Sequence, residues 1–123
     1  MTFKELAYEA QREILNLRPQ QLSGNDQLTD LRIIINRVID EWALDRFFVY
    51  AGQPGAYVVF VAFPDLTTDY TFAPGYTNLL VKWLAVKGFP SMKIYGKSDT
   101  PEMKQLEADA MAARHAMDGV GVV

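Results

Sequence analysis

The side chains that most often carry out acid–base catalysis are few in this sequence and are not grouped for it. The one histidine, His115, stands late in the last predicted helix, where the helix dipole favours a positive charge, so we interpret it as structural. The acidic pair Asp40–Glu41 lacks a partner histidine, and we expect it on a solvated or subunit-contacting face. Phosphate-binding glycine motifs and the G-x-S-x-G motif are absent. The sequence therefore predicts no catalytic residue and no enzyme.

A pair of aspartates in a predicted loop is the candidate for metal binding. Asp65 and Asp69 stand in a D-x-x-x-D arrangement. Hard cations such as Ca²⁺ or Mg²⁺ usually take more oxygen ligands than two carboxylates supply. We therefore predict no metal ion and no cofactor. A metal-dependent hydrolase that uses these two aspartates is the last of three alternatives, and it would require metal bound to the purified protein.

Four lysines in and after the third predicted helix are the candidate for a phosphate contact. A solvated face is the usual role of such a group, and a small helical nucleic-acid-binding or regulatory protein is the second alternative. The net charge of -3 and the pI near 5.0 give no overall positive field to hold nucleic acid. The lysines are Lys82, Lys87, Lys93 and Lys97.

The composition indicates one domain with surplus apolar surface. The chain has 123 residues, 50% of them hydrophobic, and such a share leaves apolar area for a partner. With no cysteine, disulfides and thiolate metal sites are excluded. The charged N-terminal stretch does not resemble a signal peptide, and no stretch is apolar enough for a membrane span. We expect an intracellular chain with no membrane partner.

Apolar residues at spacings of three and four predict helices in the first third of the chain. Thr2 and Glu5 have the spacing of a capping box at the start of the first helix, and Pro19 stops it. The second helix covers about residues 26–46, and we expect the other segments to cover its apolar side.

Two further helices are predicted in the last third. One follows Pro74-Gly75 and ends at Gly88 or Pro90, and the other begins near Pro101. The apolar sides of the last three helices supply the expected core. Its predicted members are Leu31, Ile35, Val38, Trp42, Leu80, Trp83, Leu84 and Leu106.

Aromatic and β-branched runs predict a small β element at about residues 47–72. Segments 47–50, 57–63 and 70–72 suit a hairpin or meander between the second and third helices. Segment 57–63 has no polar alternation, so we expect both of its faces to be covered, one by the helices and the other by another subunit. The predicted fold is mainly α, a four-helix, bundle-like chain with this β element.

The last five residues form a C-terminal arm of unusual composition. We predict a single helical domain at 1–118 and a flexible arm at 119–123. An apolar arm can add as a strand to a sheet edge or enter a groove on another subunit, and a frayed terminus is the alternative. The residues of the arm are Gly119, Val120, Gly121, Val122 and Val123.

The order of these blocks resembles the head-to-tail adaptors of tailed bacteriophages, also called head completion proteins, packaged-DNA stabilisation proteins or tail accessory factors. Residues 31–51, LRIIINRVIDEWALDRFFVYA, are similar to the family's helix-to-strand segment through Asn36, Asp40, Glu41, Trp42, Arg46 and Tyr50. Residues 70–113 are similar to its second half through Pro74, Gly75, Tyr76, Leu84, Ala85, Tyr95, Gly96, Pro101 and Ala110.

The resemblance implies a structural role in the virion, at the interface of head and tail, after assembly in the host cytoplasm. Copies of the chain, typically twelve in that family, would form a ring under the portal protein, extend the DNA channel, retain packaged DNA without reading its sequence, and dock a downstream tail or stopper protein. The C-terminal arm would reach the portal or a neighbouring subunit. Subunit or tail contacts are expected at Gly52, Gln53, Pro54, Gly55, Asp65, Leu66 and Asp69.

Overall fold

Four helices and one β-hairpin make up the part of the chain that the computed structural model describes, residues 1–15, 25–92 and 101–117. The hairpin lies between the second and third helices, so the predicted fold class is confirmed. None of the described helices is long and apolar enough to cross a membrane. The elements are α1 (Phe3–Leu15), α2 (Asn25–Leu44), β1 (Val49–Gln53), β2 (Ala56–Phe60), α3 (Tyr76–Met92) and α4 (Pro101–Ala116).

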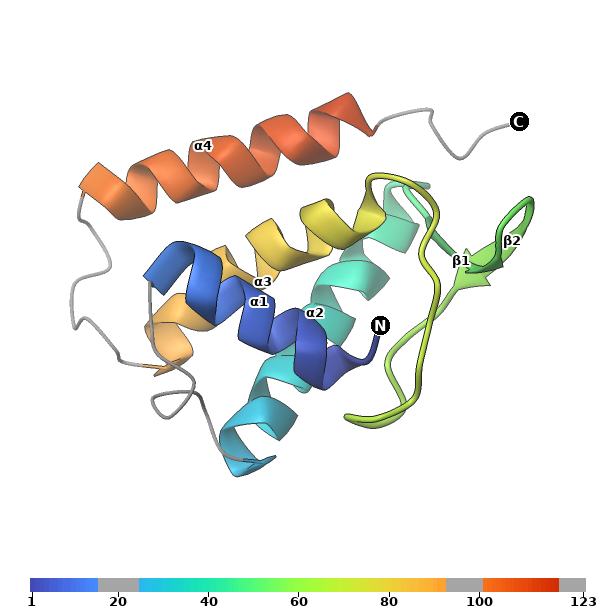
Figure 1. Ribbon diagram of the computed structural model, residues 1–123. Helices are drawn as coiled ribbons and strands as arrows, with labels where there is room; N and C mark the ends of the chain where they lie inside the picture. The colour runs from blue at the N-terminus through green and yellow to red at the C-terminus, as the bar shows by residue number, and fades with distance from the viewer. Residues whose placement is uncertain (16–24, 93–100, 118–123) are drawn as a thin grey trace.

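The helix at the centre of the molecule is α3, which packs against α1, α2 and α4 (Figure 1). We expected the other segments to pack around α2 instead, and the apolar side of α2 is indeed buried, from Leu28 to Trp42. α3 also continues through Gly88 and Pro90, where the sequence predicted its end. Its residues up to Gly88 are buried on several sides, so tertiary packing outweighs the local cost of glycine and proline.

Two helix ends show how local sequence directs the chain. At the start of α1, the Glu5 amide donates to Thr2 Oγ1 at 3.2 Å, which is the predicted cap. At the end of α2, Arg46 adopts a φ of 60°, and the Phe47 amide donates back to the Trp42 carbonyl at 2.8 Å. This is a Schellman motif with arginine at the position that glycine usually occupies. The motif turns the chain sharply from α2 toward β1.

The predicted core residues are buried to different degrees. Leu31, Ile35, Val38, Trp42, Leu80 and Leu84 are buried, and each is at most 5% exposed. Trp83 is only half-buried and packs against the edge of the core. Leu106 is also half-buried, so our placement of it in the core was wrong. α4 lies against α3 on one side of the molecule (Figure 1). Of its described apolar stripe, Ala110 is buried, whereas Leu106 and Ala113 are half-buried.

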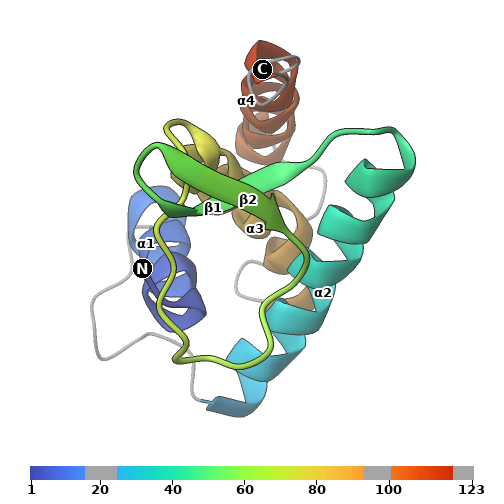
Figure 2. The ribbon, with the colours of Figure 1, turned by 90° about the vertical axis from the view of Figure 1, so that its right-hand side faces the viewer.

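The hairpin lies across one end of the helices (Figure 2). β1 and β2 pair antiparallel, with Val49 opposite Phe60 and Gln53 opposite Ala56. β2 ends at Phe60, three residues before the predicted end of the strand at 63. On the other side of β1, Ala51 forms an antiparallel bridge with Phe72, so the predicted third extended segment joins the sheet.

Aromatic packing fixes the sheet to the helices. Phe60 and Phe63 lie with ring centroids 4.8 Å apart in an edge-to-face arrangement, and Phe63 meets Phe3 of α1 at 5.2 Å. Phe60 also contacts Phe72 at 5.4 Å. Such aromatic pairs add about 0.5–1.5 kcal/mol each beyond the area they bury. These contacts fix the inner face of the sheet against the helices, and they thereby fix the position of the outer edge of β2.

Candidate interaction surface

The backbone of β1 has hydrogen-bonding neighbours on both sides. Ala51 pairs with Val58 of β2. On the other side, the Gly52 amide donates to the Thr71 carbonyl at 2.8 Å, and the Ala73 amide donates to the Tyr50 carbonyl at 2.9 Å. β1 is therefore the middle strand of a meander whose outer members are β2 and segment 71–73.

The outer edge of β2 has no such partner among residues 1–15, 25–92 and 101–117. Backbone groups alternate in direction along a strand, and Tyr50 and Gly52 direct theirs toward segment 71–73. Their partners across the hairpin, Val59 and Tyr57, consequently direct their amides and carbonyls away from β1. Among the residues that the structure describes, none hydrogen-bonds to these outward groups. We call the backbone edge from Tyr57 to Val61 the open edge.

Apolar side chains surround the open edge. Val58, Val59 and Val61 are 66%, 46% and 72% exposed. No charged residue stands between Arg46 and Asp65 in the sequence. Edge strands that remain solvated in free monomers usually carry charges, prolines or bulges that prevent pairing with another chain. The open edge has none of these protections, so it has the properties of a surface that another chain covers.

The end of β2 is set by side chains of α2. Asn36 Oδ1 accepts from the Phe63 amide at 2.9 Å, and Asn36 Nδ2 donates to the Phe63 carbonyl at 3.0 Å. Arg32 Nη1 donates to the same carbonyl at 2.8 Å. These bonds take the place of a strand partner at Phe63, whose side chain is buried. The sequence analysis singled out Asn36 for its resemblance to a family motif and missed this role.

The hairpin turn projects from the same sheet, and we predicted contacts with a partner there. Gln53, Pro54 and Gly55 are exposed, and Gly52 is half-buried. Gly55 has a φ of 81°, which follows from its place after proline in a tight two-residue turn. The turn is therefore accessible, and it lies just before the open edge in the sequence.

The loop at 64–69 is ordered by its own aspartates. Asp65 Oδ1 accepts from the Thr67 and Thr68 amides at 3.0 and 2.7 Å, and Oδ2 accepts from the Thr68 hydroxyl at 2.9 Å. These hydrogen bonds, the one from the Thr68 side chain foremost, lower the pKa of Asp65. Leu66 is half-buried against the core. The aspartate is therefore part of the loop's own framework.

Asp69 is occupied by a different partner. Its Oδ1 accepts from the amino group of Met1, and this contact lowers the pKa of Asp69. The two aspartates therefore point to separate partners and do not converge. In the ranges that the structure describes, no group of three acidic, histidine or cysteine side chains is placed to hold a metal ion.

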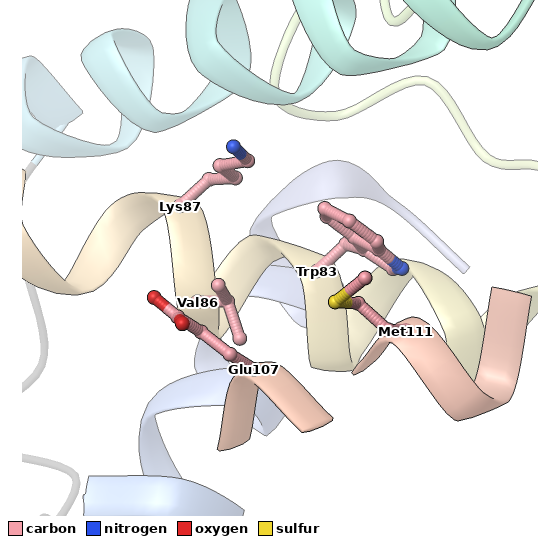
Figure 3. A pocket seen from close by; sticks show the side chains of 5 residues that line it. All are labelled: Trp83, Val86, Lys87, Glu107 and Met111. Atoms are coloured by element: carbon pink, nitrogen blue, oxygen red, sulfur yellow. The ribbon is translucent and has the colours of Figure 1, made fainter. Parts of the chain in front are cut away.

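A shallow hollow lies between α3 and α4. It has a volume of about 250 Å³ and is lined by Trp83, Val86, Lys87, Glu107 and Met111 (Figure 3). Trp83 Nε1 donates to the Ala110 carbonyl at 2.9 Å, which fixes the indole to α4. Lys87 points away from the Glu107 carboxylate (Figure 3). The hollow combines one apolar wall with two separated charges, and none of its side chains is a nucleophile paired with a base.

The other chemical candidates are spread over the surface. Lys87 is exposed, and its ammonium lies 5.7 Å from the ring centroid of Trp83. Lys82 is half-buried on the same helix, and Lys93 and Lys97 fall outside the described residues. Asp40 and Glu41 are exposed on α2 and His115 is exposed on α4. The structure brings none of these together with Asp65 or Asp69 in a hydrogen bond or ion pair that it describes.

Arg114 is a structural residue that the sequence analysis did not identify. Its guanidinium lies 4.5 Å from the ring centroid of Phe47 and 6.0 Å from that of Trp42. It also pairs with Asp45 at 3.6 Å. Arg114 therefore joins α4 to the corner where α2 turns into the sheet. A single arginine in a predicted helix gives no sequence signal for such a contact.

The comparisons with known proteins add nothing to the surface described above. No protein-family model matches the chain, and no curated protein or solved structure matches it significantly. The C-terminal arm, 119–123, lies outside the described residues.

Proposed function

We propose that this chain is a subunit of the head-to-tail connector of a tailed bacteriophage. Copies of it form a ring under the portal protein, extend the DNA channel, retain packaged DNA and dock a downstream tail or stopper protein. The chain acts as a structural protein of the virion and not as an enzyme. The ring is dodecameric, as is typical of the adaptors that the sequence resembles.

The observation that carries this proposal is the open edge of β2. It is an uncharged edge with three exposed valines, and it also leaves outward backbone groups without a partner among the described residues. A surface of this kind is covered in an assembly, and a ring of identical subunits covers it in every copy.

The charge of the chain also supports the proposal. A net charge of -3 gives no attraction for the phosphates of DNA, so a channel wall built from this chain would let the duplex pass. A regulatory protein that binds nucleic acid through Lys82 and Lys87 would instead have to attract the phosphates of DNA. Its binding to duplex DNA would be tight at low salt and would fall steeply as salt rises.

The test is reconstitution with the portal protein of the same phage. The purified chain is mixed with purified portal, and the product is imaged by electron microscopy. We expect an added ring of density on the tail-facing side of the portal, and none with the portal of an unrelated phage. A portal that remains bare at high concentrations of the chain would refute the proposal. In parallel, the chain alone should show no salt-dependent affinity for duplex DNA.

A further inference from the structure

We propose that the open edge of β2 receives the C-terminal arm, 119–123, of a neighbouring copy as an added β-strand. The inference rests on the proposed function, since it names the contact between adjacent subunits of the ring. It connects two features that are otherwise unexplained, an unprotected strand in the structure and an apolar, uncharged arm in the sequence.

The acceptor is complete in the structure. Tyr57 and Val59 direct backbone donors and acceptors outward, in the spacing that an added strand needs. Val58, Val59 and Val61 supply apolar area on both sides of that line. Backbone pairing would give the affinity, and valine-to-valine contacts between strands would add to it.

The donor contains three residues that favour a strand. Val120, Val122 and Val123 are β-branched, whereas the two glycines of the arm are of a type depleted in strands and add no bulk beside the sheet. The arm carries no side-chain charge, so its burial against the valines of β2 brings no cost for desolvating a charged side chain.

The last described residue, Met117, lies on the far side of the sheet from β2. Its side chain packs against Gly75, where an added methyl group would meet the Met117 sulfur at 2.6 Å unless the thioether side chain moved. Gly75 follows segment 71–73, which borders β1 on the side opposite β2. Met117 and the open edge therefore lie on opposite sides of β1.

This geometry favours a neighbour over the chain's own arm. A strand added to β2 would lie three strand spacings from segment 71–73, or about 14 Å. The residues 118–123 can span about 20 Å when fully extended. Residues 118–123 of the same chain would use most of their length to cross the sheet, and few of them would be left to pair. The arm of another copy has no such constraint.

The same geometry makes the contact head-to-tail. Each copy offers a donor at one edge of its meander and an acceptor at the other, so every copy contacts two neighbours through different surfaces. Contacts of this heterologous kind close into rings when the rotation between copies is right.

The first test uses two variants that are complementary to each other. One lacks residues 119–123 and keeps the open edge. The other carries Val59→Pro, which removes an outward amide while the inward pairs of Val58 and Phe60 with β1 remain. Val59→Thr is the matched control, since it keeps the amide. Circular dichroism checks that each variant is folded.

Sedimentation velocity without portal gives the result. We expect the unmodified chain and Val59→Thr to form larger species as concentration rises, and each defective variant to remain monomeric. An equimolar mixture of the two variants should form a heterodimer and nothing larger. Monomers in that mixture, or oligomers of the arm-deleted variant alone, would overturn the inference.

The second test uses cysteine pairs and does not depend on Val59→Pro folding. The natural chain has no cysteine, so the introduced cysteines are the only thiols that can form a disulfide. A chain carrying both Val59→Cys and Val122→Cys should give a ladder of disulfide-linked copies on a non-reducing gel. Val59→Cys alone should stay monomeric. Dimers from Val59→Cys alone would indicate pairing of β2 with β2, and a disulfide within one chain would indicate self-pairing. Either result, or no disulfide at all, would overturn the inference.

The two proposals fail in different experiments. A ring on the portal without the 59–122 disulfide would leave the proposed function standing and refute the arm contact. A disulfide-linked ladder with a bare portal would support the arm contact and refute the proposed function.

Discussion

Asn36 of α2 holds Phe63 by its backbone, with one hydrogen bond to the amide at 2.9 Å and one to the carbonyl at 3.0 Å. A side-chain amide has one donor end and one acceptor end, so it replaces a strand partner at this residue. The contact fixes the point where the chain leaves β2 and turns along α2. It thereby sets the length of the open edge.

Asn36→Ala is expected to destabilise the fold markedly. It leaves the Phe63 amide without its partner, and the carbonyl keeps only the bond from Arg32. An unsatisfied, partly buried backbone group costs about 1–3 kcal/mol, and urea denaturation should show a loss of that size. Arg37→Ala, at the exposed next residue, is the control and should change stability by less than about 0.5 kcal/mol. Equal stability of the two variants would show that the Asn36 contact contributes nothing.

Arg46→Gly is expected to stabilise the protein. Arg46 has a φ of 60°, and the left-handed conformation costs a residue with a Cβ about 1–2 kcal/mol, of which the greater freedom of unfolded glycine offsets about half. The expected gain is about 0.5–1 kcal/mol, measured as a higher melting temperature. Arg46→Ala removes the same exposed side chain but keeps the strain, so it should show no such gain. If alanine and glycine gave the same melting temperature, the backbone conformation would not be the cause.

Asp65 is expected to make the stability of the fold depend on pH in the acid range. Hydrogen bonds from Thr68 and Thr67 lower its pKa below 3.8 in the folded state, so its contribution is complete above 3.8 and is lost as pH falls through the lowered value. The melting temperature of the native chain minus that of Asp65→Ala should be largest near neutral pH and should shrink below pH 3.8. A carboxyl ¹³C titration gives the pKa directly. A midpoint above 3.8 would contradict the assignment.

Gly75→Ala is expected to destabilise the start of α3 for two separable reasons. Gly75 has a φ of 94°, and an added methyl group would meet the Met117 sulfur at 2.6 Å. In the native chain we expect a loss above the roughly 1–2 kcal/mol that the backbone conformation alone costs. In a Met117→Ala background the clash is absent, and the loss should fall to about that value. An unchanged loss in the two backgrounds would show that Met117 does not press on Gly75.

The order and type of the elements could be predicted because they depend on short-range pattern. The capping box at Thr2, the apolar side of α2 and the position of the hairpin follow from residue spacing and turn chemistry. These signals are contained within a single element. Predictions from these signals therefore do not depend on how the rest of the chain packs.

The predictions that were wrong concern features that depend on contacts between distant elements. Pro90 is expected to end an isolated helix, yet α3, on which three other helices pack, continues to Met92. Leu106 lies on the apolar stripe of α4, but no neighbour in the described part of the chain buries it fully. The stop of β2 at Phe60 depends on Asn36, which is distant in sequence. Hydrophobic spacing carries no information about such partners.

The candidate surface was foreseen only in part. The uncharged strand at 57–63 predicted a face that another subunit covers, and the structure shows which valines and which backbone groups are left open. The alternation that selects Tyr57 and Val59 depends on the register of the hairpin. That register is fixed by the turn at Pro54-Gly55 and by the hydrogen bonds that join Gly52 and Tyr50 to segment 71–73. No part of this could be derived from composition.

The run of uncharged residues from Phe47 to Pro64 also bears on how the isolated chain behaves. Short β-prone stretches without flanking charges are templates for fibrillar aggregation when they stay exposed. Overproduction of the chain by itself should therefore give deposits that bind thioflavin. If the chain assembles as proposed, a cell that makes it productively would have to match its supply to that of its partner.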